Sequence, residues 1–297
     1  MKPAYLNLSQ KELKARKEEA YRRLEKCNIC PHECQVDRIQ DEKGVCRAGS
    51  QVAIASYGPH FGEEEPLVGR YGSGTIFFTY CNLKCVYCQN YEISCGTEGK
   101  EISIEELADI MTDLQEMKCH NINLVTPTHY VPQILAALEK AVQKGLKIPL
   151  VYNCGGYESL ATLKLLDGII DIYMPDMKYS SEEVARKYSG IRNYPETVKK
   201  AVKEMYRQVG DLQVDEHGVA LRGLIIRHLV LPERLAGTTE IMRFIAQEIS
   251  PTAFVNIMEQ YYPAYRAKDF PPLNRRISPQ EYLEALEEAR RAGLKIK

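Results

Sequence analysis

From residue 73 onward, short apolar runs alternate with segments of helical periodicity, and this alternation limits the folds open to the chain. Repeated strand–helix units give parallel strands that are joined by right-handed crossovers. About six such repeats can be followed along the sequence, which is fewer than a closed eight-stranded barrel requires. The sequence therefore predicts an α/β fold, a partial open (β/α)6 barrel, with ligands bound beyond the carboxyl ends of its strands.

The expected strands are short, and several of the expected helices carry capping signals. Ser103 and Glu106 form a capping-box pattern, Gly145 follows a helix, and Ser278 with Pro279 opens the last helix. We expect strands over residues 74–80, 122–126, 148–152, 169–174, 221–231 and 254–258. We expect helices over residues 9–26, 104–117, 131–144, 158–166, 181–188, 195–209 and 239–249, and a last one from 279.

The first 72 residues differ from the rest in composition. A charged helix is followed by residues 27–50, which are rich in cysteine and turn residues and poor in apolar ones. Such a segment cannot build a core of its own, so a bound metal is its natural organiser. Residues 51–72 hold several Gly and Pro residues and are predicted to be a connecting loop. We therefore divide the chain into an N-terminal extension, residues 1–72, and the barrel, residues 73–297.

Charge and hydropathy exclude several classes of partner. The 39 basic and 40 acidic side chains nearly cancel, so no field of one sign attracts nucleic acid or an anionic membrane. The first twenty residues are polar and charged, unlike a signal peptide. The apolar run over residues 224–231 contains Arg227 and His228 and is too short to span a bilayer. We expect a cytoplasmic protein with neither a nucleic-acid nor a membrane partner.

Ten cysteines are many for a chain of this length, and seven of them fall in two tight clusters. Without an export signal, such clusters indicate metal sites rather than disulfides. The alternative is a set of buried, inert thiols, which fits Cys95, Cys119 and Cys154 better than the clustered seven. The two clusters consist of Cys27, Cys30, Cys34 and Cys46, and of Cys81, Cys85 and Cys88.

The second cluster directly follows the first expected strand, with the spacing C-x3-C-x2-C at Cys81, Cys85 and Cys88. Three thiolates on one short loop are suited to three irons of a cubane and leave the fourth iron open to a substrate group. The spacing therefore predicts that these cysteines are metal ligands of a catalytic, redox-active [4Fe–4S] cluster. The alternative is a structural zinc site with Cys95 as the fourth ligand, which would make the protein a non-enzymatic binding module.

The first cluster has the spacing C-x2-C-x3-C-x11-C over Cys27, Cys30, Cys34 and Cys46. Four thiolates would fill a tetrahedral zinc site or hold a second Fe–S cluster. The spacing predicts a second metal site and leaves the metal open, with redox-sensing thiols as the alternative.

The loop at Cys81 resembles the signature of the radical S-adenosylmethionine (SAM) superfamily, in which an aromatic residue such as Tyr87 usually precedes the last cysteine. Further blocks resemble PflX-like proteins, homologues of the enzyme that activates pyruvate formate-lyase. They are GSGTIFFTYCNLKCVYCQN, NINLVTPTHY, YNCGGY, DIYMPDMKY, RHLVLP and NIMEQYYP. The resemblance implies a partial barrel that binds SAM on the open iron and cleaves it with one electron into methionine and a hydrogen-abstracting 5′-deoxyadenosyl radical.

The same resemblance implies two kinds of partner besides SAM. One is an electron donor such as flavodoxin or ferredoxin. The other is a protein substrate, a glycyl radical enzyme in which the radical is installed. A small molecule or a peptide is the alternative substrate.

Polar residues that follow the second and third expected strands are candidates for holding SAM, together with Tyr87. Thr126 and Thr128 stand where activating enzymes usually have a Gly-Gly-Glu motif for the SAM amino group. Their hydroxyl oxygens can accept hydrogen bonds from an ammonium group, although an ordinary turn explains them equally well. Asn153, beside Gly155 and Gly156, resembles the turn that faces the SAM ribose in the family, and the glycines permit close backbone approach.

Charged residues follow the next two strands. Asp176 and Lys178 resemble the Asp-x-Lys of activating enzymes, which lies near the methionine part of SAM. Arg227 belongs to a block like the Arg-x-x-Val-Pro of the family, and a buried charge is costly unless it is paired. We expect these three residues to contact SAM or the substrate, with ion pairs that only stabilise the fold as the alternative.

Overall fold

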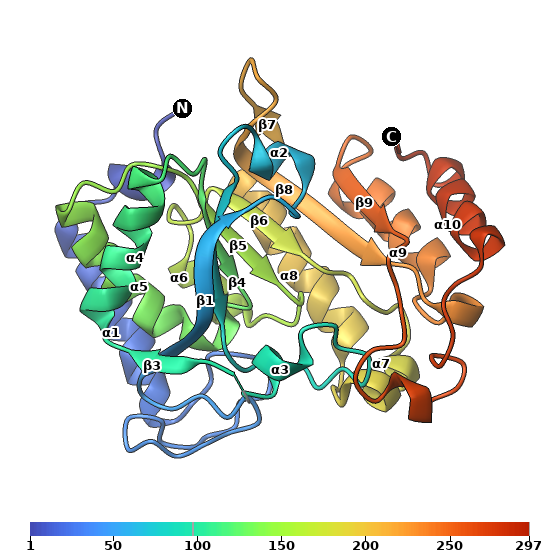
Figure 1. The fold of residues 1–297 in the computed structure, drawn as a ribbon, viewed down its shortest axis with the longest axis horizontal. Coiled ribbons are helices and arrows are strands. Elements are labelled where there is room, and N and C mark those ends of the chain that lie inside the picture. The colour runs from blue at the N-terminus through green and yellow to red at the C-terminus, as the bar shows by residue number, and fades with distance from the viewer. Residues whose placement is uncertain (97, 297) are drawn as a thin grey trace.

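Parallel strands form the centre of the fold in the computed structural model, which describes residues 1–96 and 98–296 (Figure 1). In their order across the sheet they are β2 (Ser73–Phe78), β4 (Ile122–Val125), β5 (Leu150–Cys154), β6 (Ile172–Pro175), β8 (Ala220–Leu229) and β9 (Phe254–Met258). Because these strands run in one direction, their carboxyl ends meet at one edge of the sheet. These are the strands that the sequence predicts, with bounds that differ by a few residues.

The sheet is mixed and open. At one end β1 (Val52–His60) pairs antiparallel with β2, and β3 (Lys100–Ile102) pairs antiparallel with β1. Near the other end β7 (Gln213–Val214) pairs antiparallel with the start of β8, while β9 pairs with its second half. In the described part of the chain no pairing joins β9 to β1 or β3, which confirms an α/β fold built as an open, partial barrel.

Most of the helices cover the outer face of the sheet (Figure 1). The helices are α1 (Gln10–Glu25), α2 (Glu65–Val68), α3 (Tyr91–Ser94), α4 (Ile104–Glu116), α5 (Val131–Gln143), α6 (Leu160–Leu165), α7 (Glu182–Ser189), α8 (Tyr194–Val209), α9 (Thr238–Phe244) and α10 (Pro279–Arg291). The two short helices α2 and α3 were not expected from the sequence. Capping boxes at Ser9, Ser103 and Ser278 start α1, α4 and α10. The helix expected over residues 239–249 ends in a π-helical turn, Ile245–Ile249.

The N-terminal helix packs on the barrel rather than standing apart. Helix α1 lies against α5, where Lys17 Nζ is 2.6 Å from Glu139 Oε2, and α5 in turn packs against α4 (Figure 1). All five residues of β5 are buried, as in a strand that is covered on both faces. The sheet and its helices thus share one core.

One expectation about the N-terminal part is wrong. Residues 51–72, expected as a connecting loop, contain strand β1 and the short helix α2. The Gly58-Pro59 pair suggested a loop, but β3 pairs only with Val52–Ile54, so the rest of β1 has a free outer edge on which Pro59 costs no ladder hydrogen bond. The division of the chain at residue 72 stays a prediction, and its far end, Lys297, lies outside the described residues.

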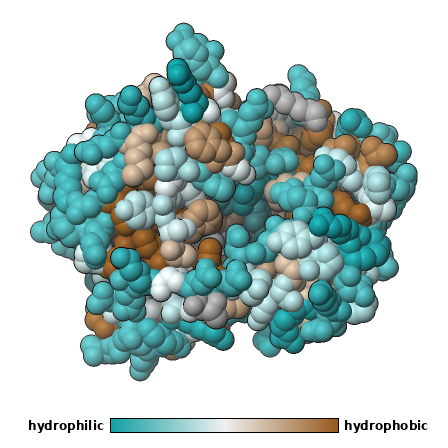
Figure 2. Space-filling model, viewed as in Figure 1, coloured by the Kyte–Doolittle hydropathy of each residue, from teal (hydrophilic) through white to brown (hydrophobic). Residues whose placement is uncertain are grey.

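The face of the molecule drawn in Figure 2 is largely hydrophilic, as expected for a chain with an ordinary share of charged side chains. In the view of Figure 2 the periphery is mostly hydrophilic, whereas hydrophobic side chains gather nearer the middle, around a hollow. Among the described helices, none has the length and apolar character that a membrane crossing requires.

The turn after β5 depends on a glycine that touches the next strand. Gly156 has φ +77°, and a Cβ built there would lie 2.5 Å from the carbonyl oxygen of Asp176 and 2.7 Å from Val198 Cγ2. Gly145 also has a positive φ, +95°, but nothing lies within 4 Å of its Cβ position. The two glycines therefore share backbone strain and differ in steric crowding.

We expect Gly145→Ala to lower the free energy of unfolding by about 1 kcal/mol, because a Cβ is strained in the left-handed region. Gly156→Ala should lower it by roughly 3 kcal/mol or more, because the β5 turn must also move away from Asp176. Urea unfolding of both variants measures the difference, and equal midpoints would show that the crowding at Gly156 is unimportant.

Candidate active site

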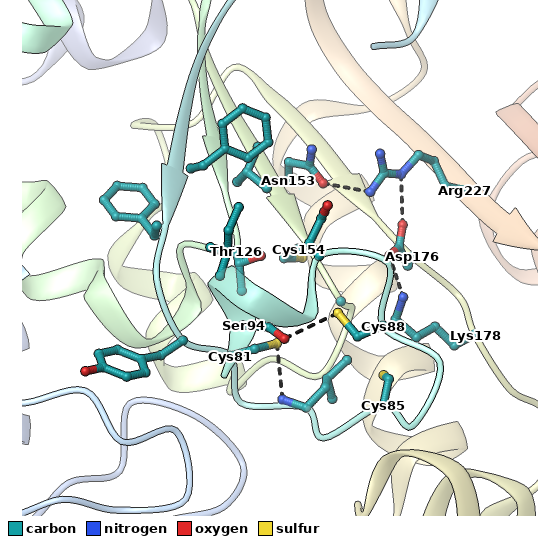
Figure 3. Close-up of a pocket in the computed structure, with 18 residues that line it drawn as sticks. Cys81, Cys85, Cys88, Ser94, Thr126, Asn153, Cys154, Asp176, Lys178 and Arg227 are labelled. Atoms are coloured by element: carbon teal, nitrogen blue, oxygen red, sulfur yellow. Dashed lines mark hydrogen bonds and ion pairs between the residues drawn. The ribbon is translucent and has the colours of Figure 1, made fainter. Parts of the chain in front are cut away.

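A cavity of about 160 Å3 opens where the carboxyl ends of five parallel strands meet (Figure 3). Its walls come from the ends of β2, β4, β5, β6 and β8 and from the loop that follows β2. The lining includes eight predicted site residues, namely Cys81, Cys85, Cys88, Thr126, Asn153, Asp176, Lys178 and Arg227. Residues that are separated by up to 146 positions in the sequence thus face one space, as expected for the strand ends of a parallel sheet.

The loop that carries the three cysteines is held by its neighbours on both sides. The backbone N–H groups of Lys84 and Val86 donate to carbonyl oxygens at the end of α7, over 3.0 and 2.9 Å. The side chain of Asn82 donates to the carbonyl oxygen of Tyr157 over 2.8 Å. These bonds fix the loop so that all three cysteines face the cavity (Figure 3).

Each of the three sulfur atoms has a hydrogen-bond donor. The N–H of Leu83 donates to Cys81 Sγ at 3.3 Å. Ser189 Oγ donates to Cys85 Sγ at 2.9 Å, and Ser94 Oγ donates to Cys88 Sγ at 3.3 Å. Donors aimed at sulfur favour the thiolate form and tune a metal that the thiolate holds. The two serines come from α7 and α3, and nothing in the sequence marks them as part of the site.

The donor set fits a cluster of irons. Burial, followed by the charge of the neighbouring Cys85, raises the pKa of the Cys81 thiol to about 12, so ionising these thiols together requires a compensating cation. Among the described residues no three His, Cys, Asp or Glu side chains converge as they do around a single ion. A cubane does not require its ligands to converge on one point, since each thiolate binds a different iron. Cys95 lies outside the residues that line the cavity.

A charged network borders the cavity beside Cys85 and Cys88 (Figure 3). Asp176 accepts hydrogen bonds from Arg227 Nε at 2.8 Å and from Lys178 Nζ at 2.7 Å. Arg227 also donates to Asn153 Oδ1 at 2.8 Å and lies 3.7 Å from Glu63. The network therefore ties β5, β6 and β8 to the segment after β1. Glu63 was not predicted, because it stands in a run of three glutamates that looks like an ordinary exposed loop.

In this network, pairing with opposite charges shifts the pKa values of Asp176 and Lys178 more than burial does. Burial by itself would raise the pKa of Asp176, but the Arg227 and Lys178 cations hold that pKa below its usual value. Burial would likewise lower the pKa of Lys178, yet the Asp176 carboxylate and the nearby Cys85 thiolate raise it. Both side chains are therefore charged at neutral pH. Because an ammonium group has three donors, Lys178 can bind a further anion while it remains paired with Asp176.

Two residues at the edge of the cavity have strained backbones. Tyr80, just before Cys81, has φ +69°, and Thr126, at the end of β4, has φ +59°. A positive φ is rare for a bulky or β-branched residue and tends to occur at functional sites. The N–H of Thr126 donates to the carbonyl oxygen of Asn153 over 2.8 Å, which fixes this conformation beside the cavity.

Two of the predicted SAM contacts do not line the cavity. Thr128 is buried, and its hydroxyl donates to Glu158 Oε1 over 2.6 Å. Tyr87 lines an adjoining recess that shares Cys85, Cys88 and the charged network with the cavity, and its hydroxyl accepts a hydrogen bond from Tyr179. The four cysteines of the first cluster lie between α1 and β1, outside the cavity lining.

Glu158 is a buried carboxyl group beneath the cavity that the sequence analysis missed. Besides the bond from Thr128, it accepts one from the Tyr152 hydroxyl over 3.0 Å. Burial raises its pKa to about 7, and the hydrogen bonds only partly oppose this effect. Glu158 follows the Gly-Gly pair closely, and neither an apolar periodicity nor a motif at this position indicates that its side chain is buried.

Comparison with known proteins assigns the family. The model of the radical SAM superfamily matches residues 75–214, which run from within β2 through the cysteine loop to the end of β7. The uncharacterized protein MJ0674 of Methanocaldococcus jannaschii is 34% identical over 280 residues, which cover 91% of this chain and 76% of that protein. This chain belongs to the radical SAM superfamily. Members of the superfamily are enzymes that use a [4Fe–4S] cluster and SAM, and these are the cofactors of this chain.

Two solved structures are similar at low identity. A radical SAM methyltransferase from Sphaerobacter thermophilus is 12% identical with a TM-score of 0.48, over 75% of this chain and 65% of that one. HydG, a maturase of the [FeFe]-hydrogenase, is 13% identical with a TM-score of 0.49, over 97% of this chain and 62% of that one. The chain thus spans less than two thirds of either structure.

We expect the pH dependence of stability to change in Glu158→Gln. The folded-state pKa of Glu158 is raised to about 7 from 4.5, so the group stabilises the fold fully below pH 4.5 and loses this contribution as the pH rises to 7. Between pH 4.5 and 8 the loss amounts to roughly 3 kcal/mol.

Glutamine cannot ionise, so the variant should lose less unfolding free energy than the wild type between pH 5 and 8. Part of the fall should remain, because burial also raises the pKa of Asp171, to about 6. Chemical unfolding at the two pH values measures both proteins, and the same fall in each would show that Glu158 is already ionised at pH 5.

Proposed function

We propose that Cys81, Cys85 and Cys88 each hold one iron of the superfamily cluster and that the chain cleaves SAM reductively. The observation that carries this proposal is the meeting of three cysteines and a charged network around one cavity at the strand ends. The cluster supplies one electron and an open iron, so that SAM yields methionine and a 5′-deoxyadenosyl radical, which takes a hydrogen atom from the substrate. The protein residues position SAM and exclude water.

The charged network is suited to the methionine part of SAM. Lys178 Nζ has donors to spare after its bond to Asp176, and it lies close enough to Cys85 for the two charges to interact. We propose that Lys178 binds the SAM carboxylate, while Asp176 and Arg227 hold Lys178 in place. The carbonyl and hydroxyl oxygens at Thr126 are then available to the amino group, and Asn153 to the ribose.

The roles of two other predicted residues change with their positions. The hydroxyl of Thr128 is committed to Glu158, so we propose that Thr128 positions the β4 turn rather than contacting SAM. Tyr87 borders the adjoining recess, where we propose that it lines the way in for the substrate.

For the substrate we propose a glycyl radical enzyme, with the chain acting as its activating enzyme. The support is the resemblance of six blocks, from the cysteine loop to NIMEQYYP, to PflX-like proteins. The electron donor would then be a flavodoxin or ferredoxin. A small molecule or a peptide is the second candidate, since Thr126-Pro127-Thr128 replaces the Gly-Gly-Glu motif. Deuterium transfer from a labelled candidate into 5′-deoxyadenosine separates the two.

We expect anaerobically reconstituted protein to form 5′-deoxyadenosine from SAM when dithionite supplies the electron. Cys85→Ala should abolish this product, because one of the three iron ligands is lost. Cys119→Ala is the matched control, since Cys119 is buried away from both clusters and should leave the yield unchanged.

Chromatography measures the 5′-deoxyadenosine that the wild type, Cys85→Ala and Cys119→Ala each form. A wild-type protein that yields none, or equal yields from wild type and Cys85→Ala, would end the proposal. Colourless protein that carries zinc in place of iron and sulfide would favour the non-enzymatic binding module.

Lys178→Met should weaken the binding of SAM about tenfold, because one charged hydrogen bond is lost. Lys203→Met is the control, since Lys203 pairs with Glu248 on the surface at 2.6 Å. Equilibrium dialysis with labelled SAM, on protein of equal iron content, measures the affinity. Unchanged affinity in Lys178→Met would remove Lys178 from the SAM site.

A further inference from the structure

The segment between α1 and β1, residues 26–51, forms neither a helix nor a strand, and three of its four cysteines are among its few buried residues. Cys27, Cys30 and Cys46 are only 6%, 6% and 5% exposed, and Cys34 is half-buried. Cys46 and Ala48 reach the main core, but the apolar cluster around Cys27 is small and consists of Leu24, Cys27 and Ile29 with Tyr21 and Val36 at its edge. So little apolar burial does not account for the order of a segment this long, because fixing each residue costs conformational entropy.

The backbone of this segment is strained around the cysteines. Glu33, Gln35, Asp41 and Arg47 all have positive φ, between +43° and +69°, although none of them is glycine. Gly44 touches Cys34 so closely that a Cβ would lie 2.9 Å from its sulfur. Strain of this kind persists only where the surroundings hold it in place, which is what metal–thiolate bonds would do.

The four sulfur atoms form one group. Cys46, Cys27 and Cys34 all lie close enough to Cys30 to interact with it electrostatically. Backbone N–H groups donate to three of the sulfurs, from His32 to Cys30, from Val45 to Cys34 over 3.4 Å, and from Ala48 to Cys46. N–H groups aimed at sulfur are among the features that tune Fe–S clusters.

A buried arginine supplies positive charge to this group. Arg38 is 0% exposed, and it forms no ion pair with a carboxylate in the described part of the chain. It donates to the carbonyl oxygens of Gly49 and His129 over 2.9 and 2.8 Å, and its Nη1 lies 4.0 Å from Cys27 Sγ. A buried charge requires an opposite one, and a cluster held by four thiolates is anionic.

Two hydrogen-bonded bridges join the segment to the active-site loop. His32, between Cys30 and Cys34, bonds through Nε2 to the carbonyl oxygen of Asn82 over 2.7 Å, next to Cys81. On the other side, Arg38 donates to the carbonyl oxygen of His129. His129 Nε2 in turn bonds to the carbonyl oxygen of Thr79 over 2.8 Å, two residues before Cys81. Both bridges end beside the same cysteine.

We propose that Cys27, Cys30, Cys34 and Cys46 hold a second [4Fe–4S] cluster, through which electrons reach the cluster at Cys81, Cys85 and Cys88. This inference deepens the proposed function and rests on it for the destination of the electron. A flavodoxin- or ferredoxin-type donor reduces the N-terminal cluster by one electron. That cluster then passes the electron to the active-site cluster and returns to its oxidised state. No bond forms or breaks in the transfer.

An Fe–S cluster fits the group better than zinc does. A tetrahedral zinc ion draws four sulfurs to about 2.3 Å from one point, whereas a cubane spreads them over its four corners. In the part of the chain that the structure describes, no three such ligands converge on one point. All four irons would have a cysteine ligand, which suits electron transfer rather than chemistry at the metal.

The binding site is tested in a protein that lacks the active-site ligands. After anaerobic reconstitution, the variant Cys81→Ala/Cys85→Ala/Cys88→Ala should hold about four irons and four sulfides and absorb visible light, as one [4Fe–4S] cluster does. Adding Cys30→Ala and Cys46→Ala should remove all of them, and adding Cys119→Ala instead should remove none. Zinc without sulfide, or no metal at all, would overturn the inference.

This result does not depend on SAM chemistry, so the inference and the proposed function can fail separately. The full-length wild type gives an independent count in case the triple variant does not fold. It should hold about eight irons, and Cys30→Ser should hold about four. Equal iron in these two proteins would contradict a second cluster.

The electron-transfer role is tested by the rate at which the active-site cluster becomes reduced, followed by electron paramagnetic resonance. The measured quantity is the ratio of the rate with a reduced flavodoxin or ferredoxin to the rate with dithionite, which is small enough to enter the cavity. The ratio should fall at least about tenfold in Cys30→Ser, the equivalent of 1.4 kcal/mol in barrier height. The same ratio in Cys30→Ser and wild type would show that electrons do not enter through the N-terminal cysteines.

Discussion

The parallel pairing of successive strands, from β2 to β4, β5, β6 and β8, is the constraint on which the rest of the structure depends. In register, Gly74 lies beside Ile122, and Ile122 beside Leu150, so neighbouring strands end at nearly the same level. Every strand end therefore delivers its next side chains to one edge of the sheet. The cysteine loop, Thr126, Asn153, Asp176 and Arg227 face one cavity because they follow these strand ends.

The cavity brings cysteine thiols together with a network of charged side chains, and the charge of each group affects the other. Three thiols on one loop are costly to ionise in a buried place, and the pKa of Cys81 is raised accordingly. Beside them, Lys178 and Arg227 remain cationic because Asp176 lies between them. Three cysteines whose thiols ionise on binding iron, next to a paired cationic network, are suited to hold a metal cluster and a zwitterionic amino acid side by side. The N-terminal cysteine segment reaches the same loop through His32 and through the contact of Arg38 with His129.

Much of the fold was predictable because the signals are local. Apolar runs marked all six parallel strands, and the Ser–Glu capping boxes marked the starts of α4 and α10. The errors occurred where tertiary pairing overrides local sequence. Strand β1 contains Gly58 and Pro59 and looks like a loop, but it can use an edge position that only the assembled sheet provides. Thr128 has the spacing of a cavity residue, yet its hydroxyl turns away from the cavity to the buried Glu158.

The sequence by itself determined the superfamily chemistry and the order of the strands. A C-x3-C-x2-C spacing lies within one loop, and a strand's periodicity lies within one segment, so both can be recognised without knowing any distant contact. Only the tertiary structure decided which carboxylates are buried, which serines donate to the sulfurs, and that the buried Arg38 lies beside Cys27. These features join residues that are far apart in the chain, such as Cys85 and Ser189. Their contact depends on how helices pack over the sheet, which no local pattern records.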